Sequence, residues 1–179
     1  LMQIELRKQG RGAVFDAVLK TYAQYSKKNV RACLGVYRRH VPAIRLRADA
    51  RRALKRLKNH LLYIVTDGNS IVQRRKARAM KLDRLVKKII ATRCYGVSRE
   101  KPSPFVFQKI CKWEQVPPTE IVYIGDDPNK DFVGIKPLGF KTVRVRRGRF
   151  ADVARDERHE AKRAVRSLDE ITESFLASL

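Results

Sequence analysis

The chain is poor in acidic residues, in cysteine and in long apolar runs, and each shortage excludes a class of protein. Its 179 residues include 18 Asp and Glu against 41 Lys and Arg, a formal net charge of +23. The three cysteines are odd in number and lack metal-site spacing, so they predict reduced thiols and a cytoplasmic location. No apolar run approaches the ~20 residues of a membrane span, and residues 1–6 lack the apolar core of a secretory signal.

The positive charge is spread along the chain instead of being confined to one motif. Basic clusters recur at 45–47, 51–58, 74–78 and 144–149. Spread charge of this kind favours a polyanion partner such as nucleic acid, and a solubilising surface explains it equally well. No nucleic-acid-binding module is recognisable, and Trp113 with the other aromatic residues is expected in the core.

The few acidic residues gather directly after an apolar run. Residues 121–124 (Ile-Val-Tyr-Ile) predict a buried strand, and Gly125 begins a turn that carries Asp126, Asp127 and Asp131. Ligands and metals collect at the carboxyl ends of strands in open α/β sheets, and clustered carboxylates suit Mg²⁺. The same residues are typical of a capped helix start, so this segment alone leaves both interpretations open.

Two further segments carry residue types that bind phosphate. Residues 61–66 predict a second buried strand, which ends in the Thr66 hydroxyl and the backbone amides of Asp67 and Gly68. An ordinary strand–turn–helix connection explains these residues as well. In the other segment Pro102 follows Lys101 and holds it in an extended conformation, which would fix the direction of the lysine ammonium group. A lone lysine in so basic a chain is, however, more often simply solvated.

Taken in order, these three segments resemble the haloacid dehalogenase superfamily of phosphohydrolases, across residues 47–150. The resemblance implies an α/β fold: a Rossmann-like parallel sheet with helices on both faces, plus a small helical cap. It divides the chain into a cap segment at 1–46, an α/β core at 47–150, and a C-terminal connector and helix at 151–179.

The resemblance also implies six site residues, which are Thr66, Asp67, Gly68, Lys101, Asp126 and Asp131. The first three would bind phosphoryl oxygens, and the lysine would bind the phosphoryl group and neutralise its charge. The last two would hold Mg²⁺, with Asp131 acting either through a bound water or by bracing Lys101. The lysine and these two aspartates are the expected catalytic residues.

The family's first motif, a strand that ends in Asp-x-Asp, has no counterpart in the 179 residues. In the resembling enzymes the first aspartate attacks phosphorus to form an aspartyl-phosphate, and the second is the general acid and base. Asp16 follows an apolar triplet, but the apolar spacing around it favours a helix over a strand. We therefore expect Asp16 on a helical surface and the nucleophile upstream of residue 1.

Hydrophobic periodicity and turn residues predict alternating elements in the core and helices at both ends. Helices are expected near 1–24, 27–40, 49–58, 70–80, 104–115, 129–137 and 168–179, and strands near 61–66, 88–93, 121–125 and 142–146. The family's first strand would lie between the strands at 61–66 and 121–125. We expect upstream residues, a neighbouring chain or Ala13–Leu19 to fill that position, because unpaired buried backbone groups cost about 1–3 kcal/mol each.

The function implied by the resemblance is Mg²⁺-dependent hydrolysis of a small phosphorylated substrate, without a membrane partner. Two alternatives stay open: a pseudoenzyme that has lost the nucleophile, and a basic subunit that binds nucleic acid or another polyanion. The presence of Thr66, Lys101, Asp126 and Asp131 together favours the phosphohydrolase.

Overall fold

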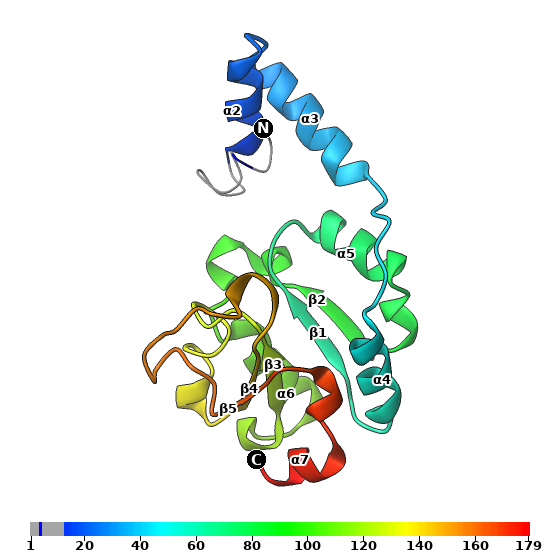
Figure 1. Cartoon of the computed structure of the whole chain (residues 1–179), viewed down its shortest axis with the longest axis vertical. Coiled ribbons are helices and arrows are strands. Elements are labelled where there is room, and N and C mark those ends of the chain that lie inside the picture. The colour runs from blue at the N-terminus through cyan, green and yellow to red at the C-terminus, as the bar shows by residue number, and fades with distance from the viewer. Residues whose placement is uncertain (1–3, 5–12) are drawn as a thin grey trace. The chain divides into compact units, whose positions relative to one another are not determined.

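Figure 1 shows the chain as a computed structural model that describes Ile4 and residues 13–179. The chain forms two compact units, which divide between Pro42 and Ala43. In the described part of both units, no helix is long and apolar enough to cross a membrane.

The first unit contains two described helices, α2 (Val14–Thr21) and α3 (Lys27–Arg39). Ser26 begins α3, because its hydroxyl accepts a hydrogen bond from the amide of Asn29 at 3.0 Å. The helix predicted near 27–40 is therefore confirmed.

The helix predicted near 1–24 is described only in part, since residues 1–3 and 5–12 lie outside the described residues. Asp16 lies in α2, where it is half-buried. The helical interpretation of its surroundings is confirmed, and Ala13–Leu19 does not serve as a degenerate strand.

The second unit alternates strands and helices as the sequence predicted (Figure 1). Short 3₁₀ turns connect several of them, for example at Leu82–Arg84, Thr92–Tyr95 and Pro118–Glu120. The helices are α4 (Ala48–Arg56), α5 (Ser70–Ala79), α6 (Phe105–Glu114) and α7 (Glu173–Ala177), and the strands are β1 (Tyr63–Thr66), β2 (Lys88–Ala91), β3 (Val122–Gly125), β4 (Lys141–Val145) and β5 (Arg163–Val165).

All strand pairs are parallel, and they form two separate sheets. One sheet pairs β1 with β2, and the other has the order β3-β4-β5. No described strand pairs with both β1 and β3, so the position expected for an additional strand is not filled by the residues described here. That upstream residues or another chain fill it stays a prediction.

Successive residues of β3 point to opposite faces of the sheet, as the period of two in a strand requires. Val122 and Ile124 join a cluster with residues of β4, β5 and the segments that flank α4 and α7. Tyr123 joins the opposite cluster, which includes Phe107 of α6 and Phe140. The ring centroids of Phe107 and Tyr123 lie 4.8 Å apart. Apolar contacts therefore cover both faces of this sheet.

The helix predicted over 129–137 is absent, and this prediction was wrong. The segment forms turns and then a 3₁₀ turn at Lys136–Leu138. The Asp127 carboxylate accepts a hydrogen bond from the Asn129 amide at 3.1 Å, which favours a turn over a helix. Pro137, which has no N–H donor, further weakens helix formation here.

The C-terminal region also differs from the prediction. The helix expected over 168–179 is divided into a 3₁₀ turn at Leu168–Glu170 and the short α7. Thr172 separates them, because its side chain accepts the Phe175 amide at 3.1 Å and so begins a new helix. The strand β5 was not predicted, since three residues are too few to show a period of two.

Gly134 lies in the turn region after β3, where the backbone approaches the loop that carries Lys101. A Cβ atom on Gly134 would lie 1.7 Å from the carbonyl oxygen of Pro102. Only glycine therefore fits without displacing one of the two segments. The close contact keeps the turns after β3 against the lysine loop.

We expect Gly134→Ala to lower the free energy of unfolding by about 1–3 kcal/mol, because the methyl group overpacks this contact. Urea unfolding followed by the fluorescence of Trp113, the single tryptophan, reports on the unit that contains Gly134.

Gly35→Ala provides the matched control, because Gly35 lies inside α3 and its Cβ would make only ordinary contacts, at 3.5 Å. That change should stabilise the helix by about 0.5–1 kcal/mol, measured by circular dichroism. A Gly134→Ala protein as stable as the parent would contradict the role given to the close contact.

Candidate active site

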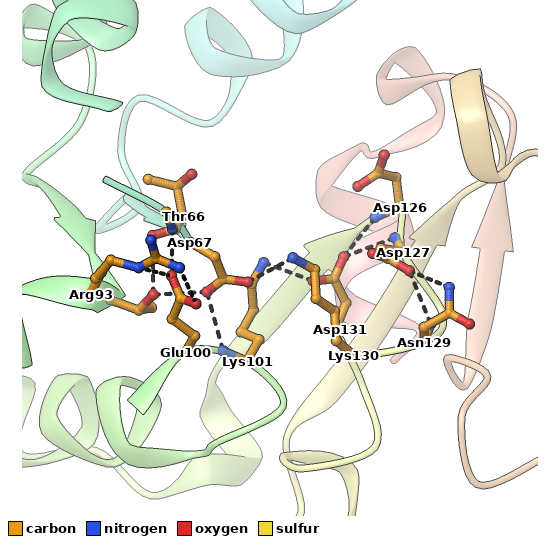
Figure 2. Close-up of polar contacts among 12 residues, drawn as sticks. Thr66, Asp67, Arg93, Glu100, Lys101, Asp126, Asp127, Asn129, Lys130 and Asp131 are labelled. Carbon is orange, nitrogen blue, oxygen red and sulfur yellow. Dashed lines mark hydrogen bonds and ion pairs between the residues drawn. The ribbon is translucent and has the colours of Figure 1, made fainter. Parts of the chain in front are cut away.

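The loops that follow β1 and β3 meet through an ion pair (Figure 2). β1 ends at Thr66, and the next residue is Asp67; β3 ends at Gly125, and Lys130 follows in the next loop. The Lys130 Nζ lies 2.7 Å from the Asp67 Oδ2. Strand ends from two separate sheets are thus joined, as the predicted site requires.

A second ion pair, between Lys101 and Asp131, is almost fully buried. The Lys101 Nζ donates to the Asp131 Oδ1 at 2.7 Å and to the Tyr123 hydroxyl at 2.9 Å. The two charged side chains are only 9% and 2% exposed. Charges at this depth are tolerated because each is paired and hydrogen-bonded.

Asp131 also fixes the turn after β3. Its Oδ2 accepts the backbone amides of Asp126 and Asp127 at 3.0 and 2.9 Å. Gly125 permits this approach, since a Cβ there would lie 2.5 Å from the same oxygen. Of the two roles expected for Asp131, these contacts are those of a residue that positions Lys101. Its part in metal binding stays a prediction.

The surroundings of the buried pair determine its protonation. Burial by itself lowers the pKa of Lys101, but the attraction of Tyr123 and Asp131 and their hydrogen bonds raise that pKa above its ordinary value. Burial raises the pKa of the Tyr123 hydroxyl. At neutral pH Lys101 is therefore a fixed positive charge, and Tyr123 is a neutral hydrogen-bonding partner.

The Asp67 carboxylate connects the loop after β1 with three other segments. Its Oδ1 accepts the Thr92 hydroxyl at 2.8 Å and the backbone amide of Lys101 at 3.1 Å, while its Oδ2 contacts Lys130. Burial by itself raises the pKa of Asp67. The contacts with Lys130, Lys101 and Thr92 lower that pKa by more, so it lies below its ordinary value. The sequence predicted a role only for the backbone amide of this residue.

The Gly68 amide, expected to bind phosphate, already has a partner inside the chain. It donates to the Glu100 Oε1 at 2.7 Å. Arg93 holds the same carboxylate through two hydrogen bonds, at 2.9 and 3.0 Å. A carboxylate of the chain itself therefore accepts this donor in the structure, and the role of Gly68 in phosphate binding stays a prediction.

Sequence reasoning missed four side chains of this region, and three of them gave no local signal. Lys130 gave one, because it is the single cation within the acidic stretch 126–131. The others reach the site from outside the recognised motifs. The four are Thr92, Arg93, Glu100 and Lys130.

Asp126 is the carboxylate best suited to hold a cation. Burial raises its pKa, and so do the charges of Asp131 and Asp127, while no Lys or Arg among the described residues forms an ion pair with it. Ile4 and residues 13–179 contain no group of three His, Cys, Asp or Glu side chains that could form a metal site. Mg²⁺ is usually held by one or two carboxylates with water and phosphate oxygens, and Asp126 fits that donor set.

Figure 2 shows Thr66 and Asp126 on either side of the two lysines, with Arg93 beyond Thr66 and Asn129 beyond Asp126. Hydrogen bonds join Asp67 to Lys130 and Lys101 to Asp131. The structure thus brings together the segments that the sequence singled out. The functional role of each residue stays a prediction.

Comparison with known proteins agrees with this arrangement. The sequence model of the haloacid dehalogenase-like hydrolases matches residues 6–139. The chain belongs to this family. Its parallel strands and the helices around them are those of a haloacid dehalogenase-like hydrolase.

Two curated relatives show how much of a longer protein the chain spans. A glyceraldehyde 3-phosphate phosphatase of Pyrococcus furiosus is 32% identical over 139 residues, which are 76% of this chain and 55% of that protein. An enzyme of the same name from Methanopyrus kandleri is 34% identical over 89 residues, 50% of this chain and 37% of that protein. The haloacid dehalogenase-like chain therefore spans about half the length, or less, of these relatives.

Solved structures confirm the α/β fold. A dehalogenase with an intermediate complex has a TM-score of 0.65 and 26% identity, and the match covers 88% of this chain and 67% of that one. A predicted phosphoglycolate phosphatase from Haemophilus somnus has a TM-score of 0.68 and 21% identity, covering 88% and 72%.

We expect Asp131→Asn to cost about 3–5 kcal/mol of unfolding free energy, because it leaves the buried Lys101 ammonium without its counter-charge. Urea unfolding followed by Trp113 fluorescence measures this loss. Asp169→Asn is the control: it breaks the Arg52–Asp169 pair, whose side chains are 59% and 39% exposed. Its effect should be much smaller. Equal losses of unfolding free energy for the two substitutions would contradict the stabilising role given to the Lys101–Asp131 pair.

Proposed function

We propose that this chain carries the phosphate- and metal-binding residues of a Mg²⁺-dependent phosphohydrolase that acts on a small phosphorylated compound through an aspartyl-phosphate. The observation that supports this most strongly is the buried Lys101 ammonium. Asp131 holds it at the strand ends that also carry Thr66 and Asp126. The names of the relatives, glyceraldehyde 3-phosphate phosphatases, support a small phosphate ester as substrate.

Each residue has a definite task in this proposal. The Thr66 hydroxyl donates to a phosphoryl oxygen, and Lys101 supplies a permanent positive charge that favours the dianionic group. Asp131 keeps Lys101 charged and in place. Asp126 would hold Mg²⁺, which when bound supplies further positive charge to the phosphoryl group. The attacking carboxylate is not among the site residues described above.

Hydrolysis of p-nitrophenyl phosphate by the natural protein tests the proposal. Activity should require Mg²⁺ and be lost on chelation, and Asp126→Asn should lower kcat by about 100-fold, the typical loss when one charge-stabilising group is removed. Asp126 is partly covered but keeps much of its surface open to solvent, so the variant should fold normally. Asp83→Asn, an exposed acidic residue of the 3₁₀ turn at Leu82–Arg84, is the control and should keep full activity. Activity that survives both chelation and Asp126→Asn would refute the site.

A second function, polyanion binding, is supported by the +23 charge and by one cavity. This cavity has a volume of about 670 Å³, and its apolar lining residues include Leu46, Met80 and Leu85. Its charged lining is entirely basic and consists of Arg45, Arg51, Lys81 and Arg84. Phosphate groups of a nucleic acid would match that charge.

Fluorescence anisotropy with a labelled RNA oligonucleotide over a range of salt concentrations tests this second function. The double substitution Arg51→Glu with Arg84→Glu should weaken binding and reduce the slope of log K against log salt by about 2. Lys27→Glu with Lys28→Glu makes the same charge change in α3 and should have little effect. No binding at physiological salt, or equal losses for the two double variants, would dismiss the function.

A further inference from the structure

The two lysine–aspartate pairs of the site are equally short but differ in exposure. Both N–O distances are 2.7 Å. In the Lys101–Asp131 pair the side chains are 9% and 2% exposed, whereas in the Lys130–Asp67 pair they are 36% and 13% exposed. The first pair is part of the core, and the second can exchange partners with a solute.

The Lys130 ammonium has hydrogen-bond donors that Asp67 does not use. It carries three N–H groups, and among the described residues it donates a hydrogen bond to the Asp67 Oδ2 alone. Lys101, in contrast, gives two of its three to Asp131 and Tyr123. A lysine with unused donors on a half-open surface can bind a second anion.

Asp67 does not depend on Lys130 for its other contacts. Its Oδ1 keeps the Thr92 hydroxyl and the Lys101 amide, so only Oδ2 would lose a partner if Lys130 moved away. Release of the lysine therefore leaves the carboxylate hydrogen-bonded. The pair is only partly buried, so breaking it costs less than breaking the buried Lys101–Asp131 pair would.

Both members of the pair adjoin the proposed phosphate site. Asp67 follows Thr66 in the chain, and Lys130 precedes Asp131, which holds Lys101. Figure 2 shows the pair within the row of side chains between Thr66 and Asp126. A lysine released from Asp67 therefore stays next to residues of the proposed phosphate site.

We propose that Lys130 is a second phosphate-binding cation, which pairs with Asp67 in the absence of phosphate and transfers to a phosphoryl oxygen when phosphate binds. The inference rests on the proposed function and adds a ligand-binding residue to it. Asp67 is then an internal competitor, because its carboxylate and the phosphate share one ammonium group. The strength of the pair sets the affinity for the phosphoryl group.

Titration calorimetry with inorganic phosphate tests the exchange in three variants. Lys130→Met should weaken phosphate binding by about tenfold, since a charge-assisted hydrogen bond is lost. Asp67→Asn should strengthen it by about twofold to fivefold, because the lysine is freed while Oδ1 still accepts its two hydrogen bonds. The double variant, which has the net charge of the parent, should bind more weakly than the parent protein.

The double variant separates the exchange from a purely structural pair. If Lys130 only shields the charge of Asp67, removing both charges restores the parent affinity, and the proposal is overturned. Lys87→Met with Glu114→Gln is the matched control, because that pair is also 2.7 Å long, with side chains 48% and 10% exposed. It should leave phosphate binding unchanged.

The outcomes for this inference and for the proposed function are distinct. A parent protein that binds no phosphate, with or without Mg²⁺, would overturn both. Phosphate binding that depends on Lys101 but is equal in the parent and in the double variant would overturn the exchange alone. Circular dichroism of each variant checks that it is folded.

Discussion

The site depends on one buried contact, the ion pair between Lys101 and Asp131. Two charges that are almost fully removed from water must neutralise each other. This requirement holds the Lys101 loop, between β2 and α6, against the turn after β3. The same carboxylate orders the amides of Asp126 and Asp127. One carboxylate therefore joins the Lys101 loop to the turn that carries Asp126, two of the three segments that the sequence singled out.

Elements with a strong local signal could be predicted from the sequence. The strand ending at Thr66 and the strand ending at Gly125 are short apolar runs followed by turn residues, and both appear as β1 and β3. The helix predicted near 104–115 appears as α6, whose apolar side chains face the core. Because parallel strands deliver their carboxyl ends to one side, the meeting of these segments followed from the pattern itself.

What could not be predicted depends on contacts between residues far apart in the sequence. The turn at 129–137 is an exception, because a local hydrogen bond from the Asn129 amide to the Asp127 carboxylate, two residues earlier, decides against a helix there. β5 forms because it pairs with the edge of β4. The sequence of its three residues alone does not indicate a strand. The hydrogen bond from the Gly68 amide to Glu100 joins residues that are 32 positions apart in the sequence. Local patterns carry no information on such pairs.

The division into two sheets has a mechanical consequence. Thr66 belongs to the β1–β2 sheet and Asp126 follows a strand of the other, and no backbone ladder among the described residues joins them. Side chains alone set the spacing of the two strand ends. The spacing of Thr66 and Asp126 can thus change without breaking any backbone ladder between the described strands.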